Sequence, residues 1–179
     1  MMDSFWSDLT EAKLNSTPIH SGPVISLTHD TVRLPNGETA LREVAWHPGG
    51  VVILPVLTSG EILLVEQFRY AVGHTLLELP AGKLNIGEDP LKAAQRELLE
   101  ETGYEAEHWQ ALGFIYTAPG FCNERLYLFR AEGLVAHPNP PKEDDEFITL
   151  HRLDAVDLRQ RVLNRQLTDA KTLSLLHYL

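Results

Sequence analysis

Three glutamates lie close together near the middle of the chain, at a spacing that could bring their carboxylates together. Glu97, Glu100 and Glu101 occupy positions i, i+3 and i+4, which share one face of a helix. Crowded carboxylates repel one another unless a cation lies between them, and their hard oxygens suit Mg²⁺. An acidic helix face exposed to solvent is the commoner use of such a run. The three residues alone therefore leave both a metal site and a solvated surface open.

A longer pattern around these glutamates favours the metal site. Gly82 is followed at fixed offsets by Glu88, Arg96 with Glu97, Glu100 with Glu101, Gly103 and the aromatic Tyr104. At ordinary residue abundances, a chance match is on the order of one in a million. The pattern resembles the Nudix box, and none of the fixed positions is missing. The resemblance implies a Mg²⁺-dependent pyrophosphohydrolase that acts on nucleoside diphosphates linked to another moiety, with Mn²⁺ as an alternative ion.

The resemblance also implies which groups hold the metal. The main-chain carbonyl of Ala81 and the carboxylates of Glu97 and Glu101 are the expected ligands. Glu100 is expected to share that ion or to bridge a second one, and we also count it among the catalytic residues. Bound Mg²⁺ would neutralise the bridging oxygens and stabilise the leaving phosphate.

Other box positions are expected to be structural. Arg96 cannot ligate a cation, and by resemblance it orients Glu88 or Glu97 through charge-assisted hydrogen bonds. Gly82 allows a tight turn and a close approach of the backbone. The structural positions of the box are Gly82, Glu88, Arg96 and Gly103.

A second set of motifs resembles the ADP-ribose pyrophosphatase branch of the family. The motifs are Glu66–Tyr70, Leu77–Gly82, Pro119–Phe121 and Glu124–Arg125. This likeness covers about residues 30–175 and implies that ADP-ribose is split into AMP and ribose 5-phosphate. GDP-sugar hydrolases share several of these motifs, so GDP-mannose or another nucleoside diphosphate sugar is the alternative substrate. A Nudix-fold nucleotide sensor that does not cut its ligand is a more distant alternative, because sensors typically lose box carboxylates.

Several residues outside the box are candidates for substrate binding. By resemblance Arg69 binds the diphosphate, for which its planar guanidinium is suited, although a surface arginine is the commoner case. Glu78 interrupts an apolar stretch, so a carboxylate buried there needs a cation or a donor. By resemblance it helps to organise the metal or substrate site, and Pro119 belongs to a motif of the same branch.

The resemblance places the catalytic base in an acidic loop after the box. That segment reads Pro140–Phe147 and contains four consecutive acidic residues. A mobile loop could close over the substrate and bring a carboxylate to the attacking water. Asp144 stands where related loops carry a glutamate, which leaves Glu146 as the first candidate and Glu143 as the second. A solvated acidic loop without a catalytic role is the alternative.

Composition narrows the class of protein. The formal net charge of −10 over 179 residues argues against a nucleic-acid partner. The single cysteine, Cys122, permits no internal disulfide and fits a reducing compartment. No apolar run reaches the length of a membrane span, and the start of the chain lacks a basic signal region. We therefore expect a soluble cytoplasmic protein.

The elements that must position these residues form a mixed pattern. Short apolar strands at 51–57, 61–67 and 76–79 precede a helix that Asp89 caps, that Pro90 opens and that Gly103 ends. Leu91, Ala94 and Leu98 are expected to face the core. Further strands are expected at 109–116, 126–131 and 147–153, with helices capped by Asp154 and by Thr168 or Asp169. This order predicts an α/β class fold of α+β type, a Nudix α/β/α sandwich with a mixed sheet.

The amino-terminal part is expected to differ from the rest. We predict that residues 1–48 hold a short helix over Ser4–Leu14, a linker over Ser16–Pro23 and a β-hairpin that turns at Pro35–Gly37. Residues 49–179 would form the Nudix domain, with the box at 82–104. By resemblance two chains pair as a homodimer, with the amino-terminal strands crossing onto the other subunit. Arg42 and Glu43 are then candidates to contact the partner's substrate.

Overall fold

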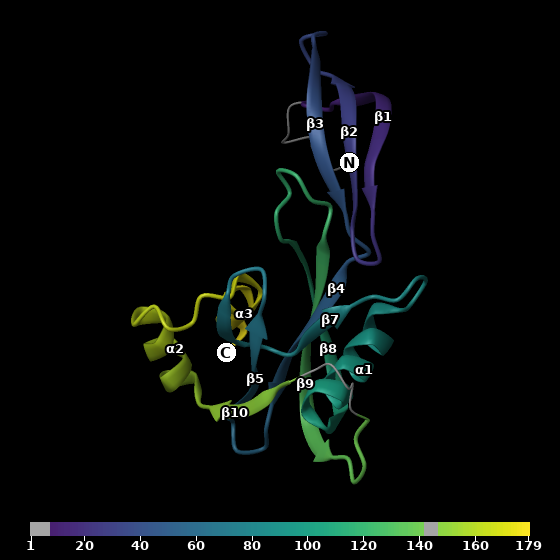
Figure 1. Ribbon diagram of the computed structural model, residues 1–179. Coiled ribbons are helices and arrows are strands. Elements are labelled where there is room, and N and C mark those ends of the chain that lie inside the picture. The colour runs from purple at the N-terminus through teal and green to yellow at the C-terminus, as the bar shows by residue number, and fades with distance from the viewer. Residues whose placement is uncertain (1–7, 142–146) are drawn as a thin grey trace, which may run out of the picture. The chain divides into compact units, whose positions relative to one another are not determined.

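The computed structural model describes residues 8–141 and 147–179. Within these residues the chain divides into two compact units. The smaller unit comprises the described residues up to Pro48 together with Ala118–Glu124, and the larger comprises Gly49–Thr117 with Arg125–Leu179. Figure 1 follows the chain through both units.

The smaller unit is a three-stranded antiparallel sheet. Its strands are β1 (Ala12–Ser21), β2 (Ser26–Arg33) and β3 (Thr39–Trp46), in the order β1-β2-β3. The predicted hairpin is present between β2 and β3, and the main-chain N–H of Leu34 donates to the carbonyl of Glu38 at 2.8 Å across the turn. Asn-Gly readily adopts the positive φ that such a tight turn needs.

The predictions for the start of the chain were wrong in two respects. Residues 12–14, expected to end a helix, belong to strand β1, and the expected linker Ser16–Pro23 is mostly strand. Residues 4–7 lie outside the described part of the chain. Backbone pairing with β2, supported by a 2.6 Å hydrogen bond from Ser16 Oγ to Asp30 Oδ1, overrides the weak helical spacing of a few apolar residues. Pro18 lies on an edge strand beside a register shift, where a missing N–H is tolerated.

The larger unit is built on a mixed sheet, as predicted. Its strands run in the order β10-β5-β4-β9-β8, with β6 paired to β5 and β7 paired to β4. Strands β4 and β9 are parallel, and the other pairs are antiparallel. The strand bounds are β4 (Gly50–Val56), β5 (Ile62–Arg69), β6 (His74–Glu78), β7 (Ala81–Lys83), β8 (Tyr104–Tyr116), β9 (Arg125–Ala136) and β10 (Thr149–Leu153).

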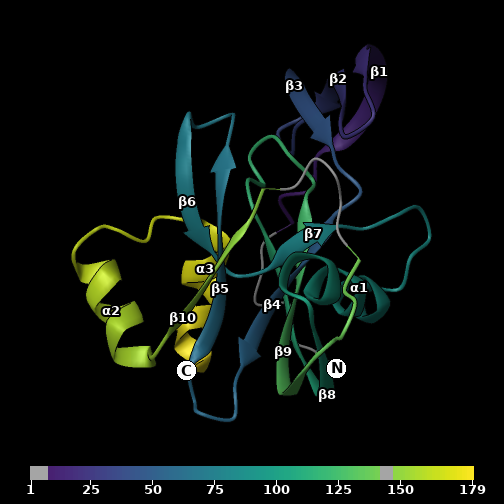
Figure 2. The same ribbon diagram turned by 60° about the horizontal axis from the view of Figure 1, so that its bottom comes forward.

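Helices cover both faces of this sheet, which gives the predicted sandwich (Figure 2). Along β4, Val51 and Ile53 pack with α1 (Pro90–Thr102). The alternate residues Val52 and Leu54 pack on the other face, where α2, α3 and the 3-10 turn η1 lie. The bounds of these last elements are α2 (Ala155–Leu163), α3 (Ala170–Leu175) and η1 (Leu176–Tyr178). A strand buried on both faces reads as a continuous apolar run, as β4 does.

Helix α1 begins and ends where the sequence predicts. Asp89 accepts hydrogen bonds from the N–H groups of Leu91 and Lys92 at 3.0 and 3.2 Å, and Gly103 ends the helix in the left-handed conformation with φ of 73°. One core assignment was wrong, because Leu91 is 36% exposed. The buried face of α1 begins instead at Ala93 and Ala94, which belong to the same core cluster as Val51 and Ile53 of β4. None of the helices in residues 8–141 and 147–179 has the length and apolar character needed to cross a membrane.

Candidate active site

The site is built where the second half of α1 packs against strand β7. The carboxylate of Glu97 lies directly against the backbone of Gly82, and a β-carbon on residue 82 would come within 1.9 Å of Glu97 Cδ. Any side chain at position 82 would therefore displace this carboxylate. Gly82 thus permits the close approach of a helix side chain to the strand, whereas the sequence predicted a tight turn and a close approach of the backbone to a metal.

Arg96 lies at the centre of the carboxylate cluster and hydrogen-bonds to three glutamates. Its Nε and Nη2 donate to Glu88 at 3.0 and 3.1 Å, while its Nη1 donates to Glu97 Oε1 at 2.7 Å and to Glu100 Oε2 at 2.8 Å. Its Nη2 also donates to the carbonyl of Lys83 at 3.1 Å. The hydrogen bonds from Arg96 lower the pKa of the Glu88 carboxyl and, with the neighbouring charges, raise the pKa of Arg96 itself. The arginine thus holds three glutamates in fixed positions.

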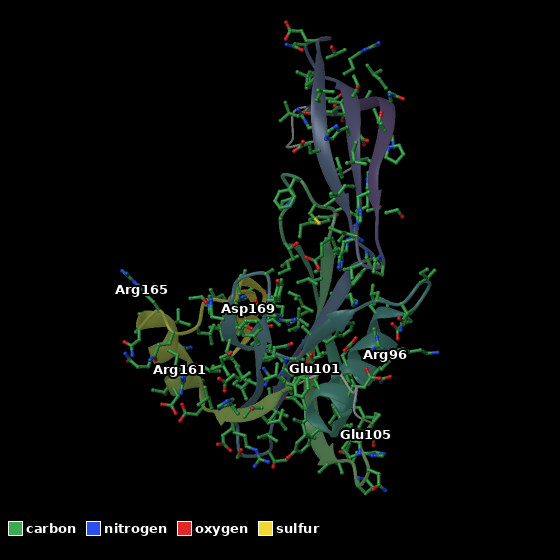
Figure 3. All side chains as sticks on the ribbon, viewed as in Figure 1. Arg96, Glu101, Glu105, Arg161, Arg165 and Asp169 are labelled. Atoms are coloured by element: carbon green, nitrogen blue, oxygen red, sulfur yellow. The ribbon has the colours of Figure 1, made fainter. Side chains whose placement is uncertain are left out.

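Glu101 reaches the strand from the last turn of α1. Its Oε2 accepts a hydrogen bond from the main-chain N–H of Ala81 at 2.9 Å, and the residue is buried. Figure 3 shows Arg96 and Glu101 on the same helix. Glu97 and Glu101, one turn apart, are therefore both held at the Ala81–Gly82 backbone, where the sequence placed the metal ligands.

The donor chemistry of this cluster suits a hard divalent cation, because carboxylate and carbonyl oxygens are the ligands that such ions prefer. Glu97 and Glu101 are buried carboxylates on adjacent turns, and the Glu97 carboxylate fills the space beside the Gly82 backbone. In the part of the chain that the structure describes, no three acidic, histidine or cysteine side chains converge as a metal cage. Two of the carboxylates, Glu97 and Glu100, meet at Arg96 instead. The residues that could hold an ion are Ala81, Glu97, Glu100 and Glu101.

A second charged cluster lies beside the first, where β5 and β6 pair. Arg69 donates through Nε to Glu78 Oε1 at 2.9 Å and through Nη2 to Glu78 Oε2 at 2.7 Å. Glu78 is buried, and Arg69 is one of the partners, a cation or a donor, that a carboxylate buried there was expected to need. Burial on its own would raise the pKa of Glu78, but the hydrogen bonds and charges of Arg69 and Lys171 outweigh burial and lower it.

Sequence reasoning missed the contribution of the carboxyl-terminal helix to this cluster. Lys171 Nζ hydrogen-bonds to Glu78 Oε2 and lies 3.0 Å from Asp169 Oδ2. Thr172 Oγ1 accepts the main-chain N–H of Leu79 at 2.8 Å. The one available signal was that a carboxylate buried in this apolar stretch needs a cation or a donor, which does not identify the residue that supplies it.

Three predicted substrate residues lie in the smaller unit. Arg42 donates to Glu11 through Nε at 3.0 Å and Nη2 at 2.5 Å, and Glu43 lies 3.2 Å from His29 Nε2. These contacts hold both side chains to neighbouring parts of the same unit. Pro119 belongs to the loop that joins this unit, where the N–H of Ala45 donates to the carbonyl of Phe121 at 2.7 Å. The base candidates Glu143 and Glu146 lie outside the described residues.

Comparison with known proteins agrees with this site. A family model described as the NUDIX domain matches residues 46–173, more than half of the chain. The chain is 41% identical to an ADP-ribose pyrophosphatase of Bacillus subtilis (strain 168), covering 96% of this chain and 93% of that protein. It is 39% identical to a methanol dehydrogenase activator of Bacillus methanolicus, covering 94% of this chain and 92% of that protein.

A solved structure supports the fold. The chain is similar to a crystal structure of an ADP compounds hydrolase, with a TM-score of 0.83 at 19% identity, over 96% of this chain and 94% of that one. The full box at 82–104, the carboxylates gathered at Gly82 and the match of the family model agree with one another. The chain belongs to the Nudix family and is a Nudix pyrophosphohydrolase.

Proposed function

We propose that the protein hydrolyses the pyrophosphate bond of ADP-ribose in the presence of Mg²⁺, giving AMP and ribose 5-phosphate. The observation that carries the reaction class is the placement of Glu97 and Glu101 at the Ala81–Gly82 backbone. The similarity to the B. subtilis ADP-ribose pyrophosphatase over 96% of the chain supports the choice of substrate. Mn²⁺ could replace Mg²⁺, because both ions take carboxylate and carbonyl oxygens.

The box residues would hold the ion and set the charge around it. Bound Mg²⁺ supplies Lewis-acid chemistry, which stabilises the negative charge that develops on the phosphate oxygens. Glu97, Glu101 and the carbonyl of Ala81 are the proposed ligands. Glu100 is proposed to share the same ion or to bridge a second one. Arg96 keeps Glu97 and Glu100 oriented, because its Nη1 donates to both carboxylates.

Arg69 is proposed to bind the diphosphate of the substrate. Two of its nitrogens are anchored on Glu78, and 39% of its side chain is exposed. Because Glu78 already holds Nε and Nη2, the guanidinium can offer its remaining N–H groups to an anion with little further loss of side-chain entropy. Proton transfer from the attacking water is assigned to Glu146, with Glu143 as the second candidate.

We also propose that the chain works as a homodimer, with residues 1–48 as the dimerisation segment. The smaller unit carries exposed apolar side chains, among them Ile19 on β1, Ile25 just before β2 and Leu41 on β3. Burying such apolar side chains against a second chain would stabilise a dimer. Arg42 and Glu43 on β3 would then be the residues that reach the partner's substrate.

Product analysis of a single substrate tests the proposed reaction. The purified protein is incubated with ADP-ribose and Mg²⁺, and the products are separated by ion-exchange chromatography. We expect equimolar AMP and ribose 5-phosphate, with no reaction after chelation by EDTA and full recovery when Mg²⁺ is added back. Intact ADP-ribose in the presence of Mg²⁺ would reject the proposal.

A further inference from the structure

We infer that Lys171, on the carboxyl-terminal helix α3, is a positioning residue for substrate binding: it balances the charge of Glu78 so that Arg69 remains available to the diphosphate. The inference rests on the proposed role of Arg69, and it extends the active site to a helix that lies about seventy residues beyond the box. "Positioning" means here that Lys171 acts through Glu78 and Arg69 and does not touch the substrate.

Glu78 is the residue through which Lys171 acts. It is only 1% exposed, and it accepts hydrogen bonds from Arg69 on one side and Lys171 on the other. A carboxylate buried this completely is costly unless cations and donors surround it. Both cations therefore stabilise the charged form of Glu78 at this place.

The four charged groups of the cluster balance one another. Glu78 and Asp169 are negative, and Arg69 and Lys171 are positive, with Lys171 lying against both carboxylates. Without Lys171, two negative groups would share a single arginine. The net negative charge would then repel a diphosphate, and it would hold Arg69 more strongly within the cluster.

Arg69 has the geometry of a group that is anchored at one edge and open at the other. Nε and Nη2 are both bonded to Glu78, whereas Nη1 makes no hydrogen bond to any residue in the described part of the chain. The side chain remains 39% exposed, in contrast to the carboxylate behind it. The free edge can accept an anion, and a charge-neutral anchored edge would not repel that anion.

The first turn of α3 also holds the backbone that leads into the box. Asp169 caps α3 by accepting the N–H of Thr172 at 3.0 Å and the Oγ1 hydroxyl of Thr172 at 2.6 Å. Thr172 Oγ1 in turn accepts the N–H of Leu79 at 2.8 Å, two residues before Ala81. One helical turn therefore fixes both the Glu78 side chain and the main chain beside it. Figure 3 shows Asp169 at the start of this helix.

The test measures anion binding and turnover in matched variants of the full chain. Inorganic pyrophosphate, without metal, is titrated into the wild type, Lys171→Met, Lys171→Arg and Arg69→Ala by calorimetry. We expect about 10-fold weaker binding in Lys171→Met, a similar loss in Arg69→Ala, and near wild-type binding in Lys171→Arg. Lys92→Met, which removes an exposed lysine from α1, is the matched control and is expected to bind as the wild type does.

Steady-state kinetics with ADP-ribose supplies the second measurement. Lys171→Met is expected to raise KM about 10-fold while kcat changes less than about 3-fold, because the interaction that weakens is the one between Arg69 and the bound diphosphate. If Lys171→Met does not fold, as judged by circular dichroism, Lys171→Gln replaces it, since glutamine removes the charge and keeps a donor to Glu78.

The outcomes separate this inference from the proposed function. Unchanged pyrophosphate affinity in Lys171→Met, or in Arg69→Ala, overturns the inference whatever the natural substrate is. A loss of kcat with unchanged KM also overturns it, because it would place Lys171 in the chemical step. Weakened pyrophosphate binding in a protein that leaves ADP-ribose intact upholds the inference and rejects only the substrate.

Discussion

The Glu97 carboxylate and the Gly82 backbone are in such close contact that a β-carbon on residue 82 would come within 1.9 Å of Glu97 Cδ. This contact and the 2.7 Å hydrogen bond from Arg96 Nη1 together fix the place of a proposed metal ligand. A side chain at position 82 would collide with the end of the flexible Glu97 side chain and not with the backbone. A substitution of Gly82 should therefore affect activity much more than stability.

Gly82→Ala is expected to keep the fold and to lose activity. The Glu97 side chain can rotate away from the new methyl group, but its carboxylate then leaves the position at the backbone. We expect a fall in kcat/KM of at least about 100-fold with a change in the free energy of unfolding of about 1 kcal/mol. Turnover is followed by AMP release, and stability by thermal unfolding.

Gly60→Ala is the control for this variant. Gly60 has a φ of 86° and nothing within 4 Å of an added β-carbon. Alanine there should cost about 1 kcal/mol of stability through backbone strain and leave turnover unchanged. Equal activity in Gly82→Ala and Gly60→Ala would contradict the role given to Gly82.

Glu101→Gln is expected to remove a ligand charge while retaining the local structure. The amide oxygen of glutamine can still accept the N–H of Ala81, so the end of α1 should stay in place. We expect turnover to fall by about 100-fold or more and the Mg²⁺ concentration for half-maximal rate to rise. Glu105→Gln, at an exposed position on β8, is the matched control (Figure 3). Wild-type turnover in Glu101→Gln would remove Glu101 from the proposed site.

Glu78 predicts how stability depends on acid. Its pKa in the folded protein lies below the ordinary value of 4.5, because Arg69 and Lys171 outweigh the effect of burial. Its contribution to stability is therefore fully present above about pH 4.5 and is lost as the pH falls through the lowered folded pKa. Glu78→Gln should be less stable than the wild type by about 2 kcal/mol at pH 7, and this difference should shrink below pH 4.

Urea unfolding at pH 7, 5, 4 and 3.5 measures this difference for the two proteins. The ordinary carboxylates elsewhere in the chain titrate in both proteins, so they cancel in the comparison. Parallel stability curves for wild type and Glu78→Gln over this range would show that Glu78 is not held charged by its partners.

The dimer proposal predicts the effect of a charge on the smaller unit. Leu41 on β3 is 73% exposed, and Leu163 at the end of α2 is 75% exposed. If the amino-terminal strands pair between chains, Leu41→Asp should yield monomers at micromolar concentration, whereas Leu163→Asp should remain dimeric. Sedimentation equilibrium distinguishes the two, and a monomeric wild type would reject the dimer itself.

The box and the helix that carries it could be predicted from the sequence because local chemistry determines them. Asp89 caps the start of α1 with its side chain, and Gly103 ends the helix through its left-handed backbone. The i, i+3, i+4 spacing alone places the three glutamates on one face of the helix. The buried run of β4 was equally clear, because a strand covered on both faces is apolar at every position.

Features that depend on distant partners could not be predicted in the same way. Strand β1 has only exposed residues, so its sequence carries no alternation to identify it, and its pairing with β2 decides its structure. The contact of Lys171 with Glu78 joins residues that are ninety-three positions apart. A carboxylate buried at position 78 was expected to need a cation or a donor, but only the fold identifies the residues that supply it.

A competition among substrates tests the central claim most directly. The protein is incubated with Mg²⁺ and an equimolar mixture of ADP-ribose, GDP-mannose, NADH and diadenosine polyphosphates, and the loss of each compound is followed over time. Preferential loss of ADP-ribose, with AMP and ribose 5-phosphate appearing together, is the predicted result. Preferential loss of GDP-mannose or of another member, or tight binding of one compound without cleavage of any, would contradict it.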